Sequence, residues 1–246
     1  MGNCSSGCLP DTTFHARLKA PATLFLAILG AAVPALIALS ALDRAKGEIP
    51  AAGRSGAEIF ESCRICHGTK EMQRGPILDG LPAWYVRSQL RKFRDGVRGT
   101  NAENRSEILM GAGQSILHDD GEIARVSDYI ASLPPAVHRR TIRQGGPGGA
   151  VLYLSCGACH GTRAEGRPEL KAPPLNVQED WYLLDQLRKF QSGLRGWHPE
   201  DGEGSLMRAA AAALQPEQMR DVIFHITRYF SATNAVAAGP LENSTK

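Results

Sequence analysis

Two short motifs stand out in this chain of 246 residues because their cysteine and histidine side chains could attach a porphyrin covalently. They are Cys63-Arg64-Ile65-Cys66-His67 and Cys156-Gly157-Ala158-Cys159-His160. Two cysteines three positions apart on a helical turn can form thioethers with the two vinyl groups of one haem, and the adjacent histidine can reach the iron. The sequence therefore predicts two covalently bound haem c groups, each with a histidine as one axial ligand.

Two other uses of a Cys-x-x-Cys pair compete with haem attachment, namely a thioredoxin-like dithiol and half of a zinc site. No βαβ pattern surrounds either motif, which argues against the dithiol. Zinc would need a fourth ligand at a matched place in each copy, and the remaining histidines supply none: His15, His118, His138, His198 and His225. Haem attachment is therefore the favoured interpretation.

An internal repeat indicates where the second iron ligand lies. Shifting the chain by 97 positions aligns residues 76–110 with residues 173–207, and 15 of the 35 pairs are identical. Met110 and Met207 form one of these pairs. A lone methionine usually fills a core, but matched methionines in two haem-binding copies predict sulfur ligation, with His118 or His198 in place of a methionine as the alternative. We expect both axial sites of each iron to be filled, which suits electron transfer and leaves no site for a substrate.

Helical periodicity dominates both copies, and no alternating strand pattern of any length appears. The fold class expected is all-α. Helices are predicted over residues 55–62, 83–95, 121–133, 149–155, 180–192 and 216–230. The Gly- and Pro-rich stretch at 135–148 breaks the periodicity and predicts a linker. Two haem domains are therefore expected, at residues 50–134 and 149–232, followed by a flexible tail at 233–246.

An uncharged stretch of 23 residues, 20–42, precedes the two copies. As a helix with about 1.5 Å rise per residue, it could cross a hydrocarbon core of roughly 30 Å. Arg17 and Lys19 come before it, so residues 1–19 are expected in the cytoplasm and the haem domains in the periplasm. We expect a single-pass anchor in the inner membrane, with a signal segment as the alternative.

The composition narrows the remaining classes of function. Lys and Arg number 28 against 25 Asp and Glu, a formal net charge of +3, so no basic surface for nucleic acid is expected. Aromatic residues make up only 6% of the chain. That is little for two small cores, and a large apolar cofactor in each would supply the missing bulk. The paired charges Arg91-Lys92 and Arg188-Lys189 are expected to be solvated, with a role at haem propionates or in docking as the alternative.

These features together resemble the class I cytochromes c, and among them the two-domain dihaem cytochrome c4 type. The resemblance covers residues 50–232 and rests on the haem motifs, the Gly75–Gly80 loop, the Trp-Tyr…Gln-Leu…Phe helix of each copy and the terminal helix near Tyr129–Pro134. It implies two tandem class I domains. It also implies that the carbonyls of Pro76 and Pro173 accept hydrogen bonds from the two motif histidines. The second copy departs from the pattern because its loop lacks the glycine found at position 80.

The function expected from these features is relay of single electrons from a redox protein donor to a terminal oxidase or reductase. The chain is expected to be a membrane-anchored electron carrier rather than an enzyme, with no small-molecule substrate. Two alternatives stay open. One is a dihaem peroxidase or thiosulfate-oxidising enzyme, which needs an open or displaceable axial site. The other is the cytochrome subunit of an oxidase or dehydrogenase complex.

Overall fold

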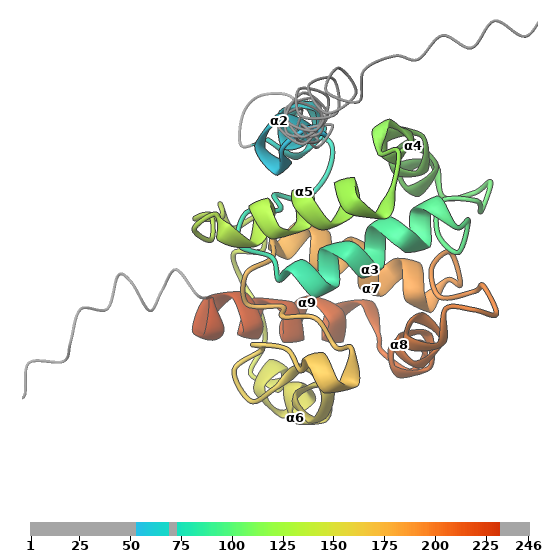
Figure 1. Ribbon diagram of the computed structural model, residues 1–246. Coiled ribbons are helices and arrows are strands. Elements are labelled where there is room, and N and C mark those ends of the chain that lie inside the picture. Colours follow the sequence, from blue (N-terminus) through green and yellow to red (C-terminus); the bar gives the residue numbers. More distant parts are fainter. Residues whose placement is uncertain (1–52, 69–72, 232–246) are drawn as a thin grey trace, which may run out of the picture. The chain divides into compact units, whose positions relative to one another are not determined.

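The computed structural model describes residues 53–68 and 73–231, and it forms two helical lobes from these residues (Figure 1). The first lobe, residues 53–134, contains α2 (Gly56–His67), α3 (Ala83–Arg94), α4 (Arg105–Gly113), the 3-10 turn η1 (Gln114–Ile116) and α5 (Asp120–Ser132). The second lobe, residues 148–231, contains α6 (Gly148–His160), η2 (Pro168–Leu170), α7 (Asp180–Gln191), α8 (Gly202–Ala212), α9 (Pro216–His225) and the π-helical η3 (Ile226–Phe230). An isolated bridge between Arg167 and Ala172 is the closest approach to a strand in the described ranges. The all-α expectation is therefore confirmed.

The expectations for residues 1–19, 20–42 and 233–246 lie outside the described residues. Within residues 53–68 and 73–231, no helix is both long enough and apolar enough to cross a membrane.

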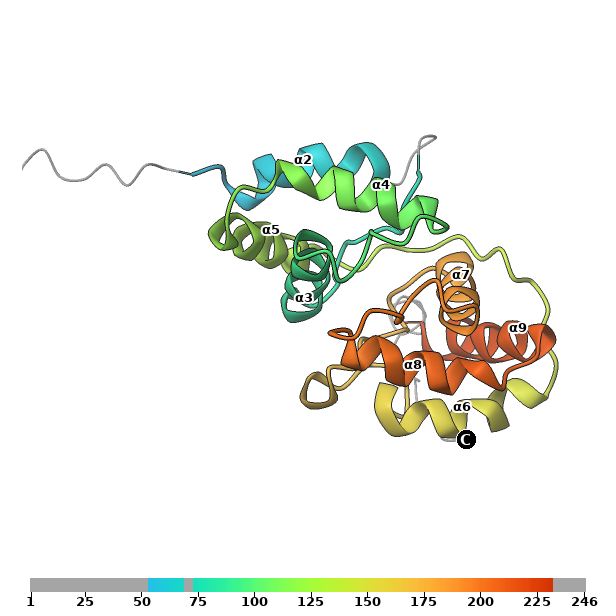
Figure 2. The same ribbon diagram turned by 90° about the vertical axis from the view of Figure 1, so that its right-hand side faces the viewer.

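Each lobe packs its motif helix against its last helix. In the first lobe α2 and α3 pack on α5, and in the second lobe α6 and α7 pack on α9, while α7 also contacts α8 (Figure 2). The first core is formed by the apolar faces of these helices and includes Ile59, Phe60, Tyr85, Leu90, Ile123, Val126 and Ile130. The second core includes Tyr153, Leu183, Leu184, Met219, Val222 and Ile223. Each core is therefore built between the helix carrying the haem motif and the helix at the end of the same copy.

Local capping explains where several helices begin. The Ser55 hydroxyl accepts a hydrogen bond from the Glu58 backbone N–H, and the Glu58 carboxylate accepts one from the Ser55 N–H, so α2 begins with a capping box. Asp119 caps α5 by accepting from the Glu122 N–H at 2.7 Å. Pro216 occupies the first turn of α9, where its missing N–H costs no helical hydrogen bond.

The motif helices are longer than the periodicity predicts. Their last helical residues are His67 and His160, and Gly68 and Gly161 are the C-cap residues. Both cysteines of each motif therefore lie on the last turns. Helices α4 and α8, which carry Met110 and Met207, were not predicted from the sequence. Both helices are short and rich in glycine and small residues, so they show little of the apolar spacing on which such forecasts depend.

A glycine in each copy lets the methionine helix approach the turn after α3 or α7. Gly196 has φ +71°, and a Cβ there would lie 2.2 Å from the carbonyl oxygen of Gly204 on α8. Gly99 has φ +86°, and its Cβ would lie 2.9 Å from the carbonyl oxygen of Glu107 on α4. Only glycine tolerates both the left-handed backbone and the contact. The repeated Arg-Gly pair therefore sets the position of the methionine helices.

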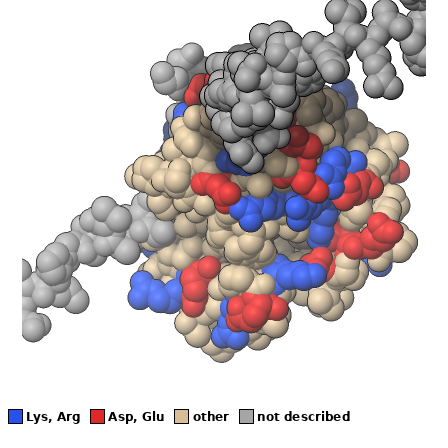
Figure 3. Space-filling view, viewed as in Figure 1, with Lys and Arg blue, Asp and Glu red and all other residues tan. Residues whose placement is uncertain are grey.

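Charges of both signs are mixed over the surface. On the face shown in Figure 3, Lys and Arg side chains alternate with Asp and Glu side chains and do not gather into an extended area of one sign. This agrees with the small net charge of +3.

Candidate functional site

The four motif cysteines lie at the ends of α2 and α6 as unpaired thiols. Cys63 and Cys156 are half-buried and pack against the cores of their lobes, while Cys66 and Cys159, one turn further on, are exposed. Burial raises the pKa of the Cys63 and Cys156 thiols. Each pair therefore presents one sulfur at the core and one at the lobe surface, along one side of a helix end.

The motif histidines are held by backbone carbonyl groups. The Nδ1 atom of His67 lies 2.6 Å from the Pro76 carbonyl oxygen, and that of His160 lies 2.8 Å from the Pro173 carbonyl oxygen. These bonds agree with the implication of the family resemblance, and the second exists although its loop lacks the glycine. Burial lowers the pKa of both histidines. Since a carbonyl can only accept, Nδ1 carries the proton and Nε2 keeps a free lone pair, the form that binds a metal.

The two predicted sulfur ligands occupy equivalent positions on α4 and α8. Met110 is half-buried and packs against the first core, and Met207 is also half-buried. By contrast, Met219, which has no methionine partner in the repeat, is fully buried within the second core. The structure thus separates a packing methionine from the two methionines at accessible, matched positions.

The surroundings of both motifs fit a haem group. Apolar side chains next to the motifs and the methionines are strongly exposed, with Ile65 and Leu109 of the first lobe at 67% each and Leu154 and Leu206 of the second at 75% and 73%, and a porphyrin would cover such groups. The Nε atoms of Arg98 and Arg195 are buried without a hydrogen-bond partner among the described residues. Such orphaned donors suit the acidic side chains of a haem. The donor set of both copies, two thiols and one neutral imidazole, is that of covalent haem attachment.

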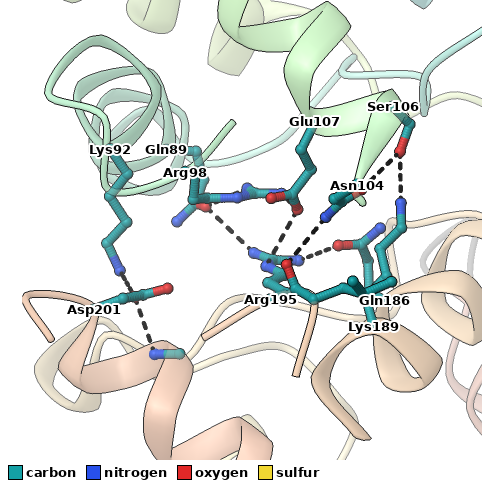
Figure 4. A network of polar contacts seen from close by, with 12 residues as sticks. Gln89, Lys92, Arg98, Asn104, Ser106, Glu107, Gln186, Lys189, Arg195 and Asp201 are labelled. Atoms are coloured by element: carbon teal, nitrogen blue, oxygen red, sulfur yellow. Dashed lines mark hydrogen bonds and ion pairs between the residues drawn. The ribbon is translucent and has the colours of Figure 1, made fainter. Parts of the chain in front are cut away.

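The repeated arginines meet at the junction of the two lobes (Figure 4). Arg98 donates to Gln89 at 2.6 Å and pairs with the buried carboxylate of Glu107. Arg195 donates to Gln186 at 2.6 Å and to Gln89 of the first lobe at 3.3 Å, and its Nε lies 4.0 Å from Glu107. Burial pushes the pKa of Glu107 upward, but the charge and hydrogen bond of Arg98 outweigh it and hold that pKa below the ordinary value. Glu107 is therefore a carboxylate between two buried arginines from different lobes.

Lysine contacts flank this network in a nearly two-fold arrangement. Lys92 of the first lobe pairs with Asp201 at 2.5 Å and with Glu203 at 2.9 Å in the second. Its counterpart in the repeat, Lys189, donates to Ser106 of the first lobe at 2.7 Å. Ser106 and Glu203 are themselves equivalent positions, so the lobes meet through matching patches, as subunits do in a two-fold dimer. These two lysines were expected to be solvated helix charges, and that expectation is wrong.

Sequence reasoning missed the junction because its pairs join residues far apart in the chain. One signal was available in the repeat itself. Charge differs between the copies at Ser106/Glu203, Glu107/Gly204 and Pro82/Glu179, and each charged member of these pairs contacts the other lobe. Charge also differs at Arg87/Leu184 and Asp95/Ser192, where the charged members pair within the first lobe, so a departure from the repeat does not by itself identify a contact between the lobes.

Comparisons with known proteins agree with this geometry. The sequence pattern of the family described as cytochrome c matches residues 54–134 and 148–228. The chain is 25% identical to cytochrome c4 of Azotobacter vinelandii over 200 residues, which cover 77% of this chain and 93% of that protein. It is 32% identical over 165 residues to the thiosulfate dehydrogenase electron acceptor of Stutzerimonas stutzeri, with 60% and 71% of the two chains covered.

A solved structure extends the likeness to the fold. Cytochrome c4 of Acidithiobacillus ferrooxidans superposes with a TM-score of 0.54 at 24% identity, covering 68% of this chain and 98% of that one. The likeness therefore includes both lobes in tandem.

Proposed function

This chain belongs to the cytochrome c family, and from that premise we propose that it relays single electrons through two covalently bound haem groups, each held by histidine and methionine. The observation that carries the proposal is the repeated geometry. In both lobes a Cys-x-x-Cys-His helix end presents a neutral histidine fixed by a proline carbonyl, and a matched methionine lies on a separate short helix. When bound, each haem supplies an iron that alternates between the ferric and ferrous states.

The residues of the chain have distinct roles in this proposal. Cys63 with Cys66, and Cys156 with Cys159, hold the two groups by thioether bonds. His67 and His160 offer Nε2 to the iron, because Nδ1 is engaged by a carbonyl. Met110 and Met207 supply the second ligand, and a thioether sulfur raises the reduction potential. No acid, base or nucleophile is needed, because an electron is transferred without breaking a bond in the protein.

The partners proposed for this carrier are a dehydrogenase as donor and a terminal oxidase or reductase as acceptor. Support for the donor comes from the relative in Stutzerimonas stutzeri, which is named as the electron acceptor of thiosulfate dehydrogenase. Reduction of the purified protein by candidate dehydrogenases, followed in the visible spectrum, tests the donor class. The same relative also supports a second candidate function, in which this chain is the cytochrome subunit of an enzyme complex.

We place the two lobes in the periplasm, anchored to the inner membrane by residues 20–42. The support is the uncharged stretch of 23 residues with Arg17 and Lys19 before it. Fractionation of cells expressing the full chain, compared with a chain that begins at residue 43 behind a cleavable signal, tests this location. Recovery of the full chain in the soluble fraction would contradict it.

Spectroscopy of three methionine variants tests the ligation. The full chain should carry two covalent haems by mass, and both ferric irons should show the long-wavelength sulfur-to-iron band. Met110→Ala and Met207→Ala should each remove half of that band and open one iron to cyanide. Met219→Leu is the matched control, because this methionine lies in a core and should leave both irons unchanged. A full band in either alanine variant would contradict the assignment, and rapid cyanide binding by the unmodified chain would favour a dihaem enzyme.

A further inference from the structure

A carboxylate of the second lobe reaches the histidine loop of the first. Glu179 precedes α7 at the N-cap position, yet its side chain does not cap that helix. It is instead buried, at 5% exposure, and accepts a hydrogen bond from the Ile77 N–H at 2.9 Å. The Gln73 side-chain amide donates to its two oxygens at 2.9 and 2.7 Å. Glu179 is thus directed away from its own helix and into the first lobe.

The peptide group that Glu179 contacts is the one that holds His67. The carbonyl of Pro76 accepts from His67 Nδ1 at 2.6 Å, and the N–H of the same peptide group, on Ile77, donates to Glu179. Hydrogen bonds arranged in such a chain polarise one another. An anion at the N–H end makes the carbonyl oxygen a stronger acceptor, and a stronger acceptor makes the imidazole a better electron donor to a metal.

Both oxygens of the Glu179 carboxylate accept hydrogen bonds from N–H donors of the first lobe. These three hydrogen bonds come from neutral groups, the Gln73 amide and the Ile77 backbone. Burial lowers the pKa of His67, whereas the Pro76 hydrogen bond and the negative charge of Glu179 act in the opposite direction. The carboxylate therefore acts on the His67 ring as well as on the peptide group.

The second copy cannot build the same chain of hydrogen bonds. His160 bonds to the Pro173 carbonyl at 2.8 Å, but the next residue is Pro174, which has no N–H to donate. The position equivalent to Glu179 is Pro82, which has no carboxylate. The chain Glu179–peptide–histidine therefore belongs to the first lobe alone.

We propose that Glu179 is a positioning residue of the second lobe that lowers the reduction potential of the haem in the first lobe. This inference rests on the proposed function. The hydrogen bond through the Pro76–Ile77 peptide strengthens His67 as a donor, which favours ferric over ferrous iron. One lobe thereby adjusts the redox equilibrium of the other through hydrogen bonds.

The test measures both reduction potentials in haem-loaded full chains. Glu179→Gln keeps the shape but removes the charge, and Ile77→Pro removes the N–H and reproduces the Pro-Pro sequence of the second copy. Each should shift the first iron toward ferrous by on the order of tenfold in the equilibrium constant, which is 59 mV for a one-electron couple. The second haem should not change. The double variant should shift the first iron no further than Glu179→Gln alone, since Ile77→Pro removes only one of the routes by which the same carboxylate acts on His67.

Asp180→Asn is the matched control. Asp180 is buried beside Glu179, but its carboxylate accepts from the backbone of Thr141 and Ile142 in the linker instead of from the histidine loop. It should leave both potentials unchanged. Haem methyl resonances in NMR spectra, assigned with Met110→Ala, identify which iron has shifted and report the electronic effect on His67 separately from stability.

Three results would overturn the inference. They are an unchanged first potential in Glu179→Gln, an equal shift of both haems, or additive shifts in the double variant. Failure of the proposed function would look different, because the unmodified chain would then lack two covalent haems with sulfur-to-iron bands.

Discussion

Replacing Glu107 by glutamine should destabilise the folded chain strongly, because the carboxylate lies between two buried arginines. The side chains of Arg98 and Glu107 are only 6% and 7% exposed, so water replaces little of the lost interaction. Arg195 of the second lobe approaches the same carboxylate at 4.0 Å. Among the described residues, the substitution removes the carboxylate that the two buried guanidinium groups share.

The structure sets the size of this effect. Removing one partner of a buried ion pair costs about 3–5 kcal/mol. Arg98 keeps its hydrogen bond to Gln89 at 2.6 Å and its stacking over the Phe93 ring at 4.4 Å, so part of its environment survives. We therefore expect a loss near the lower end, about 3 kcal/mol.

Urea unfolding of the haem-loaded full chain at neutral pH, followed by circular dichroism, measures this loss. Asp128→Asn is the control, because it breaks the Arg87–Asp128 pair, whose side chains are 33% and 60% exposed. Exposed pairs contribute about 0–1 kcal/mol. If Glu107→Gln loses no more free energy of unfolding than Asp128→Asn, the junction is not the buried, charge-dependent contact described above.

Two further predictions concern the glycine turn and the response to acid. Gly196→Ala should cost about 1–3 kcal/mol through its left-handed backbone and more through the contact 2.2 Å from the Gly204 oxygen. Gly193→Ala has a similar φ of +77° but meets nothing within 4 Å, so equal urea midpoints for these two variants would exclude the close approach. Hydrogen bonds from Lys171 and Lys92 lower the pKa of Glu203 from 4.5 to about 2. The contribution of the ionised Glu203 carboxylate to the free energy of unfolding should be complete above about pH 4.5 and disappear as the pH falls toward 2. The Glu203→Gln chain should lack that part of the decline, and identical acid-unfolding curves for the two chains would rule out this role.

Local features of the chain were predictable because they depend on residues close together. Apolar spacing predicted six helices, and the structure has a helix at each of these places, although the two motif helices continue to His67 and His160. The equivalence of Met110 and Met207 was visible in the repeat without any structure. The haem-ligand assignment itself stays a prediction for the methionine variants to test.

Contacts between the lobes were not predictable from periodicity. Lys92 looked like a solvated helix charge, yet it is mostly buried against Asp201 and Glu203, more than 100 positions away. Helix α4 was also missed, since its position depends on the close approach to Gly99 more than on an apolar stripe of its own.

The sequence by itself determined that two haem groups are bound, because the cysteine spacing and the adjacent histidine of the attachment motif occur twice. The tertiary structure decided which of the sequence differences between the two copies reaches a histidine. A carboxylate on Glu179 can act on His67 only when the lobes dock, since the Glu179–Ile77 bond that completes the connection spans 102 positions in the chain. Folding brings the Glu179 carboxylate to the loop that holds His67. The loop that holds His160 has Pro174, which has no N–H to donate to a carboxylate.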